Sequence, residues 1–439
     1  MRSQRVSGGA TRRRRLAEIW THLHNHPEPS MQEFATAEYL AGVLEQAGLK
    51  VRRFDFLPGF TADVGTGAPV IGLRAEMDAL VQNIAGEPTA VHSCGHDANM
   101  AIIATVMLEL AELGDVLEGS VRAIFQPAEE LGNGAELVAA LGVSDELEYL
   151  FGVHLRPENE LPAPYFAPSI SHGACMFASG TITGTDHHGA RPHLGANAVE
   201  VALEISEGLG RLRVDPQVPS SAKMTMLHAG GENLNVIPGS GRFGVDLRAQ
   251  TNEVMSSLRA GLDSVCARVA ASTGAVIDLD FRDAVPAAMI GPRAEAALAS
   301  AVATELGDGH LRPRIVTSGS DDFHFYTLRN PEVQAAMLAV GANVQPGLHD
   351  PSMTFEADAM ERAVRVLLEA CRQTLGRRQS LRRSTGPYRQ TFTRAGDNEQ
   401  LHPASHTVRK AVCRDAEDHP GADSTTLPIA LNDSCCVEP

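Results

Sequence analysis

The sequence lacks the features that mark disulfide-rich, membrane-spanning and nucleic-acid-binding proteins. Its 439 residues include seven cysteines, which are scattered and not spaced as a disulfide framework. No run of about 18 apolar residues is present to cross a membrane. The balance of 54 acidic against 37 basic residues gives a net charge of −17, which disfavours nucleic acid and anionic membranes as partners. We therefore expect a protein of a reducing, cytoplasmic compartment.

Internal repeats and the glycine-rich loop of P-loop nucleotide-binding proteins are also absent, and the N-terminus lacks the apolar segment of a signal peptide. The basic run Arg12–Arg15 leads directly into Leu16–Trp20, which begins an amphipathic helix. We expect residues 1–12 to be disordered and a helix to follow from about residue 13.

The length and the order of predicted elements indicate two domains. A chain of 439 residues is too long for one typical domain, and 43% hydrophobic residues suffice for a sizeable core. Helices and strands alternate up to residue 174, a βαββαβ pattern typical of a ferredoxin-like sandwich follows, and the alternation then resumes. We predict a catalytic domain that comprises residues 13–174 and 286–376. An inserted domain spans residues 175–285, and residues 377–439 form a disordered tail.

One short segment gathers side chains that bind metals. Within His92–Asp97 the sequence places a thiol, two imidazoles and a carboxylate, and one glycine separates Cys94 from His96. Such a pair suits zinc and similar transition metals. A free cysteine is also often a small buried apolar residue, so the pair alone is weak evidence. We assign no role to His92.

Carboxylates and a histidine stand where three predicted strands end. These strand-end residues are Glu76, Asp78, Glu129, Glu130 and His154. Open α/β sheets bind their ligands at the carboxyl ends of strands, so these side chains favour a metal site there over a set of solvated strand exits.

Eight short motifs follow one another along residues 13–375. They are His24–Glu28, Arg74–Leu80, His92–Asp97, Gln126–Glu130, Gly152–His154, His188–His193, Asn235–Pro238 and Leu348–Pro351. Their order and residues resemble those of the M20 metallopeptidase and amidohydrolase family, in the branch of hippurate hydrolase-like and auxin-conjugate hydrolase-like enzymes. The residues of the motifs are most similar to those of the AmhX-like subgroup.

The resemblance implies an α/β, metallopeptidase-like catalytic domain with a mixed sheet flanked by helices, and an inserted ferredoxin-like α+β lid that commonly forms a dimer. It implies one or two divalent ions, Mn²⁺, Zn²⁺ or Co²⁺, and Glu129 as general base. The implied metal ligands are Cys94, His96, Glu130, His154 and His349. Three departures from the family pattern are present: Glu76 stands where many relatives have aspartate, Asn99 where the subgroup often has a histidine, and Pro29 where leucine is common.

Further site residues have competing interpretations. His188 is implied as the oxyanion donor, acting in the partner subunit's site, but it also fits a polar loop. Asn235 and Arg248 would suit a substrate carboxylate, although Arg248 fits a strand surface equally well. Asp78, a catalytic candidate, or Asp97 could orient a ligand imidazole through its second nitrogen.

The loop Thr317–Phe323 resembles a family loop that could contact substrate. We favour a helix cap formed by Ser320 or Asp321.

These residues together predict a metal-dependent amidohydrolase acting on a small N-acyl or N-aroyl amino acid. The alternatives are a dipeptidase, an aminobenzoate-type aromatic-amine hydrolase, or a metal-binding protein without catalysis. The expected partners are a small-molecule amide substrate and a second copy of the chain, in a homodimer or higher homo-oligomer.

Overall fold

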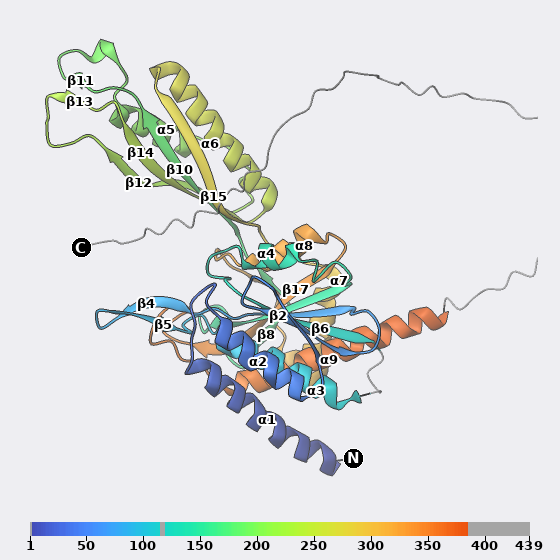
Figure 1. Cartoon of the computed structure of the whole chain (residues 1–439). Coiled ribbons are helices and arrows are strands. Elements are labelled where there is room, and N and C mark those ends of the chain that lie inside the picture. Colours follow the sequence, from blue (N-terminus) through green and yellow to red (C-terminus); the bar gives the residue numbers. More distant parts are fainter. Residues whose placement is uncertain (1, 115–118, 385–439) are drawn as a thin grey trace, which may run out of the picture. The chain divides into compact units, whose positions relative to one another are not determined.

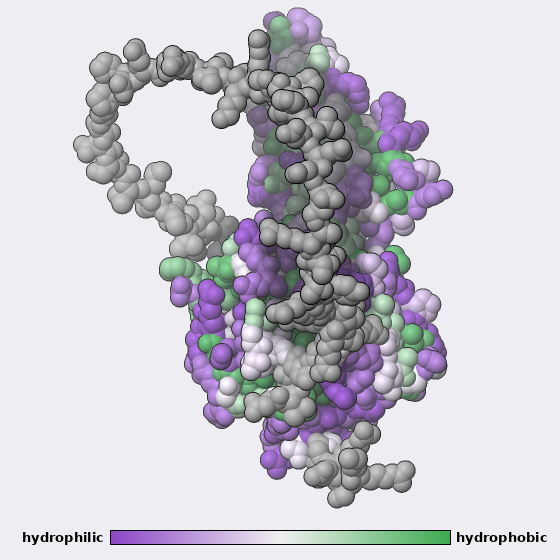
Figure 2. All heavy atoms as spheres, turned by 90° about the vertical axis from the view of Figure 1, so that its right-hand side faces the viewer, coloured by the Kyte–Doolittle hydropathy of each residue, from purple (hydrophilic) through white to green (hydrophobic). Residues whose placement is uncertain are grey.

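The computed structural model describes residues 2–114 and 119–384 of the chain (Figure 1). No helix in this part of the chain is long and apolar enough to cross a membrane. On the face seen in Figure 2, hydrophilic residues predominate and hydrophobic ones occur in small groups.

A seven-stranded mixed sheet forms the centre of the larger domain. Its strands run in the order β1 (Lys50–Arg53), β2 (Phe60–Gly65), β6 (Ser120–Gln126), β3 (Ile71–Glu76), β7 (Tyr149–Pro157), β17 (Gln334–Val344) and β8 (Phe166–Ala167). The four strands from β6 to β17 are parallel, and β1, β2 and β8 are antiparallel to their neighbours. The predicted α/β fold with a mixed sheet is confirmed.

Helices cover both faces of this sheet (Figure 1). One face packs against α1 (Arg2–His24), α2 (Phe34–Gln46), α3 (His96–Glu112), α7 (Pro292–Leu306) and α9 (Asp358–Ser384). The other packs against the short helices α4 (Gly134–Ala140) and α8 (Phe325–Arg329). Neighbouring residues of one strand divide between the two cores, since Leu150 belongs to the second and Phe151 to the first. A pleated strand requires this alternation.

The position of α3 follows from its sequence. Apolar side chains surround the helix, and nearly all of it is buried, as expected for a helix at the centre of a core. Gly95 precedes it with φ +87°, a conformation that suits glycine, and a Cβ there would come within 3.3 Å of the Leu155 side chain. The first turn of α3 therefore starts directly after Cys94, with His96 buried.

Residues 174–285 form a second sheet with its own core. Its strands run in the order β12 (Ser220–Ala229), β14 (Gly241–Ala249), β10 (Ala174–Thr183) and β15 (Val276–Val285). Helices α5 (Ala198–Gly210) and α6 (Asn252–Thr273) pack on one face of it (Figure 1). The chain order is βαββαβ, the ferredoxin-like order that the sequence predicts. A lid or dimerisation role for this domain stays a prediction.

Short elements complete the fold, and the sequence patterns miss most of them. The strands are β4 (Leu80–Ile84), β5 (Glu87–Val91), β9 (Ile170–Ser171), β11 (His187–His188), β13 (Val236–Ile237) and β16 (Ile315–Val316). The 3₁₀ turns are η2 (Pro192–Leu194), η3 (Asp308–His310) and η4 (Asp322–His324). The hairpin β4–β5 turns at Ala85 and Gly86, both with positive φ.

The helices at both ends extend beyond the predicted domain limits. Helix α1 begins at Arg2, whereas the sequence predicts a helix from about residue 13. Arginine is a good helix former, and Arg12 pairs with Glu109 of α3 at 2.9 Å and with Glu361 of α9 at 3.5 Å. Helix α9 continues past residue 376 to Ser384, in a segment where four of eight residues are arginine. The rest of the predicted tail, residues 385–439, lies outside the described residues.

Candidate metal centre

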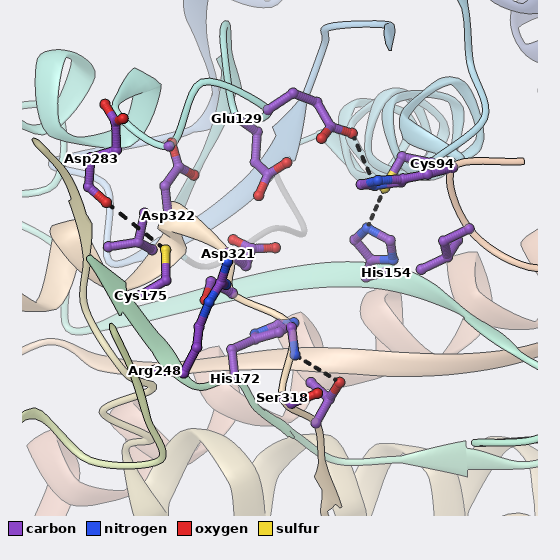
Figure 3. A pocket seen from close by; sticks show the side chains of 18 of the residues that line it. Cys94, Glu129, His154, His172, Cys175, Arg248, Asp283, Ser318, Asp321 and Asp322 are labelled. Atoms are coloured by element: carbon purple, nitrogen blue, oxygen red, sulfur yellow. Dashed lines mark hydrogen bonds and ion pairs between the residues drawn. The ribbon is translucent and has the colours of Figure 1, made fainter. Parts of the chain in front are cut away.

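The five predicted ligands lie together where the parallel strands end. Three groups of potential ligand atoms, each lying within 4.8 Å of one another, overlap: Cys94 with His96 and His154, Cys94 with Glu130 and His349, and His96 with Glu129 and Glu130. The Cys94 Sγ lies 3.6 Å from the His154 Nε2, and the Glu130 Oε1 lies 3.4 Å from the His349 Nε2. Figure 3 shows the side chains of Cys94 and His154 next to each other at one side of the pocket.

The residues present fit a bound cation. The His96 Nε2 and the Glu130 Oε1 are buried and have no hydrogen-bond partner within residues 2–114 and 119–384. Buried polar atoms normally have partners, so these two atoms require a group that accepts their lone pairs. One thiol, three imidazoles and a carboxylate form a donor set suited to zinc and to related divalent transition metals.

Backbone contacts bring distant ligands to one place. The His349 amide donates to the Ser93 carbonyl at 2.7 Å, next to Cys94, and the Gln82 side chain donates to the His349 carbonyl at 2.6 Å. His349 itself has φ +67°. These hydrogen bonds hold His349, which lies near the end of the catalytic domain, beside the segment His92–Asp97.

Glu129 and Glu130 both face this centre although they are neighbours in sequence. The His96 Nε2 lies 3.8 Å from the Glu129 Oε2 and 4.0 Å from the Glu130 Oε1. In a regular strand they would point to opposite faces. The chain departs from β geometry after β6, and Ala128 takes φ +56°. This irregular exit from the strand lets both carboxylates point toward the same centre.

Asp78, and not Asp97, contacts a predicted ligand imidazole. The His96 Nδ1 hydrogen bonds to the Asp78 carbonyl at 2.9 Å and lies 3.2 Å from the Asp78 Oδ1. The Asp78 Oδ2 accepts from the Glu130 amide at 2.9 Å and from the Ser30 hydroxyl at 2.7 Å. Burial would raise the pKa of Asp78, but its contacts with His96 outweigh burial and lower it.

Asp97 instead joins helix α3 to helix α1. Its Oδ2 accepts from the Trp20 Nε1 at 3.0 Å and contacts the His24 Nδ1 at 2.7 Å. The Trp20 and His24 rings lie 5.3 Å apart. Asp97 therefore anchors the helix that carries His96, without a described contact to the imidazole of His96.

A buried ionic cluster adjoins the centre. The guanidinium of Arg74 is fully buried and contacts Glu76 at 3.0 Å, Asp322 at 2.6 Å and Asp321 at 3.6 Å. Two of the departures from the family pattern contact each other here, because the Asn99 amide donates to the Glu76 Oε1 at 3.2 Å. Asparagine thus supplies a donor to the carboxylate that faces it.

The loop before η4 forms a cap and also lines the pocket of the metal centre. The Asp321 Oδ1 accepts from the Phe323 amide at 2.8 Å, so the predicted cap is confirmed. Carboxylate oxygens of Asp321, Asp322 and Glu129 also lie within 4.8 Å of one another. Burial, and then the carboxylates of Asp321 and Glu130, raise the pKa of Glu129 well above its ordinary value.

A pocket of about 810 Å³ opens beside these residues, and Figure 3 shows Cys94, Glu129, His154, Asp321 and Arg248 around it. Arg248 is thus part of the pocket, and its guanidinium lies 5.4 Å from the Phe177 ring centre. The sequence patterns did not single out His172, which also lines the pocket and is buried. A lone histidine before a glycine carries no signal that would have identified it.

His188 and Asn235 are not among the residues that line this pocket. His188 ends β11, Asn235 directly precedes its partner strand β13, and the Gly189 amide donates to the Asn235 carbonyl at 2.7 Å. Both side chains are exposed. A role in the site of a second subunit stays a prediction.

Comparison with known proteins matches these observations. The model of the family described as peptidase family M20/M25/M40 matches residues 72–373. N-acetyl-L-cysteine deacetylase of Bacillus subtilis is 27% identical over 384 residues, which cover 83% of this chain and 89% of the relative. IAA-amino acid hydrolase ILR1-like 4 of Arabidopsis thaliana is 30% identical over 280 residues, which cover 61% of this chain and 63% of the relative.

The fold matches solved structures as well. A dinuclear metal-binding peptidase of family M20 from Bacillus subtilis superposes with a TM-score of 0.71 at 24% identity. The superposition covers 84% of this chain and 99% of that one.

Replacing Asp78 by alanine should weaken metal binding about 10- to 100-fold, because the variant loses a carboxylate beside His96 and the acceptor of the Glu130 amide. Competition with a chromogenic chelator measures the affinity. Asp97→Asn is the matched control and should keep the affinity within about threefold while lowering the melting temperature. Equal losses of affinity in both variants would contradict the assignment of Asp78.

The contact between His24 and Asp97 should make stability depend on pH. The hydrogen bond to Asp97 raises the pKa of His24 above 6.5, despite partial burial of the ring. A raised histidine pKa adds stability that is complete below the ordinary value and is lost as pH rises through the folded value. The melting temperature of metal-free protein should therefore exceed that of His24→Gln more at about pH 5.5 than at about pH 8.5. In an Asp97→Asn background this excess at low pH should disappear, because burial alone lowers the pKa of His24.

Proposed function

The chain belongs to peptidase family M20/M25/M40, and we propose that this metal-dependent amide hydrolase cleaves a small N-acyl or N-aroyl amino acid. The observation that carries the proposal is that Glu129, Arg248 and four of the five predicted ligands line one pocket, while the fifth, His96, is buried next to them. The similarity to an N-acetyl-L-cysteine deacetylase and an IAA-amino acid hydrolase supports this class of substrate.

The ligand set would hold one or two divalent ions. Cys94, His96, Glu130, His154 and His349 would share them, and Asp78 would orient His96 through its second ring nitrogen. When bound, such ions lower the pKa of a water molecule and polarise the substrate carbonyl. Burial raises the pKa of the Cys94 thiol, so its thiolate depends on the charge of a cation.

Glu129 would act as the general base. Its carboxylate would take a proton from the attacking water and return it to the leaving nitrogen. Burial and the neighbouring carboxylates raise the pKa of Glu129, the direction that makes its carboxylate a stronger proton acceptor. Asp321 and Asp322 contribute to this shift through their negative charge.

Arg248 would bind the carboxylate of the amino-acid part of the substrate. Asp246 accepts from its Nε at 2.7 Å and from its Nη2 at 3.3 Å, which fixes the guanidinium plane. The Phe177 ring lies beside it. A guanidinium held in this way can present its remaining edge to a carboxylate.

The proposal includes a homodimer. His188 and Asn235 lie on an exposed two-stranded extension of the inserted domain, and they do not line the pocket of their own chain. In a dimer, His188 would donate to the oxyanion in the partner's site, and Asn235 would contact the substrate carboxylate.

Glu129→Gln should abolish turnover while the metal content stays unchanged. The amide cannot accept the proton, so kcat should fall about 100- to 10,000-fold. Elemental analysis of the purified variant checks the metal content. Glu160→Gln is the matched control, because Glu160 lines the same pocket and pairs with Arg156 outside the ligand groups, and its kcat should stay within about threefold. Wild-type turnover by Glu129→Gln would remove Glu129 from the base role.

Chelation should remove activity, and Mn²⁺, Zn²⁺ or Co²⁺ should restore it. We expect amine release to be fastest from N-acyl and N-aroyl amino acids in a panel that also contains dipeptides and aminobenzoyl amino acids. Full activity of the metal-stripped protein would contradict the metal-dependent mechanism. A panel that stays silent at full metal occupancy would contradict the proposed substrate class.

A further inference from the structure

A buried carboxyl group outside the metal centre has a single described contact. Glu33 stands at the N-cap position of α2, and its side chain is 0% exposed. It makes no capping hydrogen bond, because the Glu28 carboxylate accepts from the first amides of the helix, those of Ala35 at 3.2 Å and Thr36 at 2.7 Å. Helix α2 therefore does not explain the burial of Glu33.

The contact of Glu33 is with the backbone next to Glu129. The Ala128 amide, 95 positions away in the sequence, donates to the Glu33 Oε1 at 2.8 Å. Within the described ranges, the second carboxyl oxygen, Oε2, has no hydrogen-bond partner. Burying a carboxyl group costs free energy, so the burial of Glu33 indicates that its hydrogen bond to the Ala128 amide has a structural role.

The backbone conformation of Ala128 shows what this hydrogen bond stabilises. This residue is buried and has φ +56°, which residues with a Cβ seldom adopt. Its carbonyl accepts from the Gly134 amide at 3.2 Å, and a Cβ on Gly134 would come within 1.8 Å of the Pro127 carbonyl oxygen. Such a conformation persists where the surroundings determine it, and here Glu33 and Gly134 do so.

The turn at Ala128 sets the direction of the next residue. The Ala128 amide is held by Glu33, and the Glu130 amide is held by Asp78. Glu129 lies between these two anchors, and its own carbonyl accepts from the Gly132 amide at 2.7 Å. The backbone of Glu129 is therefore fixed on both sides by buried carboxyl groups that are not metal ligands.

We propose that Glu33 is a positioning residue that orients the general base, by holding Ala128 in the left-handed conformation that directs Glu129 toward the metal centre. The proposal rests on the proposed role of Glu129. Burial raises the pKa of Glu33 to about 8, so the carboxyl group is neutral at pH 7. Glutamine at this position has the same charge and keeps an oxygen that can accept from Ala128.

The variants Glu33→Leu, Glu33→Asp and Glu33→Gln test this role. Leucine removes the oxygen that accepts from the Ala128 amide, and aspartate moves this oxygen away by one methylene group. The aspartate variant provides the test if the leucine variant does not fold. We expect kcat to fall about 10- to 100-fold in both, with metal content unchanged. Glutamine should keep kcat within about threefold of the wild type.

Hydrogen exchange of the metal-free protein provides a readout that does not depend on activity. The Ala128 amide should exchange faster in Glu33→Leu or Glu33→Asp than in the wild type, and Glu33→Gln should protect it as the wild type does. Glu28→Gln is the matched control on the same segment. It should lower the melting temperature by weakening the cap of α2, with Ala128 exchange and kcat unchanged.

Three results would overturn the proposal: wild-type kcat in Glu33→Asp, unchanged Ala128 exchange, or a loss of metal that accounts for the loss of kcat. The proposed function fails separately, through full turnover by Glu129→Gln. In that case the exchange of Ala128 still reports whether Glu33 holds this backbone.

Discussion

The structure depends on the balance of charge around Arg74. A fully buried guanidinium is stable only if its desolvation is repaid by close partners, and Glu76 and Asp322 supply them. The side chain also donates to Gln126 at 2.8 Å, so it connects β3, β6 and the loop before η4. This cluster divides the acidic groups into two sets. Glu76, Asp321 and Asp322 contact the guanidinium, whereas Glu129 and Glu130 lie near His96, where a metal ion would supply positive charge.

Much of this arrangement can be predicted from the sequence because it follows local rules. Burial on both faces of a parallel strand produces apolar runs, and polar residues appear where such a run leaves the sheet. Glu130, at the exit from β6, and His154, near the end of β7, follow this rule. The insertion is equally visible, since a βαββαβ pattern interrupts an alternation that later resumes. Each of these signals lies within a few residues of the feature that it predicts.

The remaining features depend on contacts between distant segments, for which the sequence has no local signal. Glu33 and Ala128 are 95 positions apart, and neither residue type suggests the other. Asp321 satisfies a cap, which its sequence predicts, and also faces Glu129, which only the folded loop shows. The early start of α1 has the same origin, because the partners of Arg12 come from two other helices. Tertiary contacts decide these cases where local propensity does not.

The inserted domain begins and ends at paired positions. Cys175, near the start of β10, lies opposite Val285 at the end of β15, so the chain leaves and re-enters the catalytic domain at adjacent points. Because the insert also has its own core, its removal or exchange would leave the seven-stranded sheet and the five predicted metal ligands in place. Arg248 belongs to the insert and Glu129 to the larger domain. The proposed function therefore assigns substrate binding and bond cleavage to stretches of the chain that have separate cores.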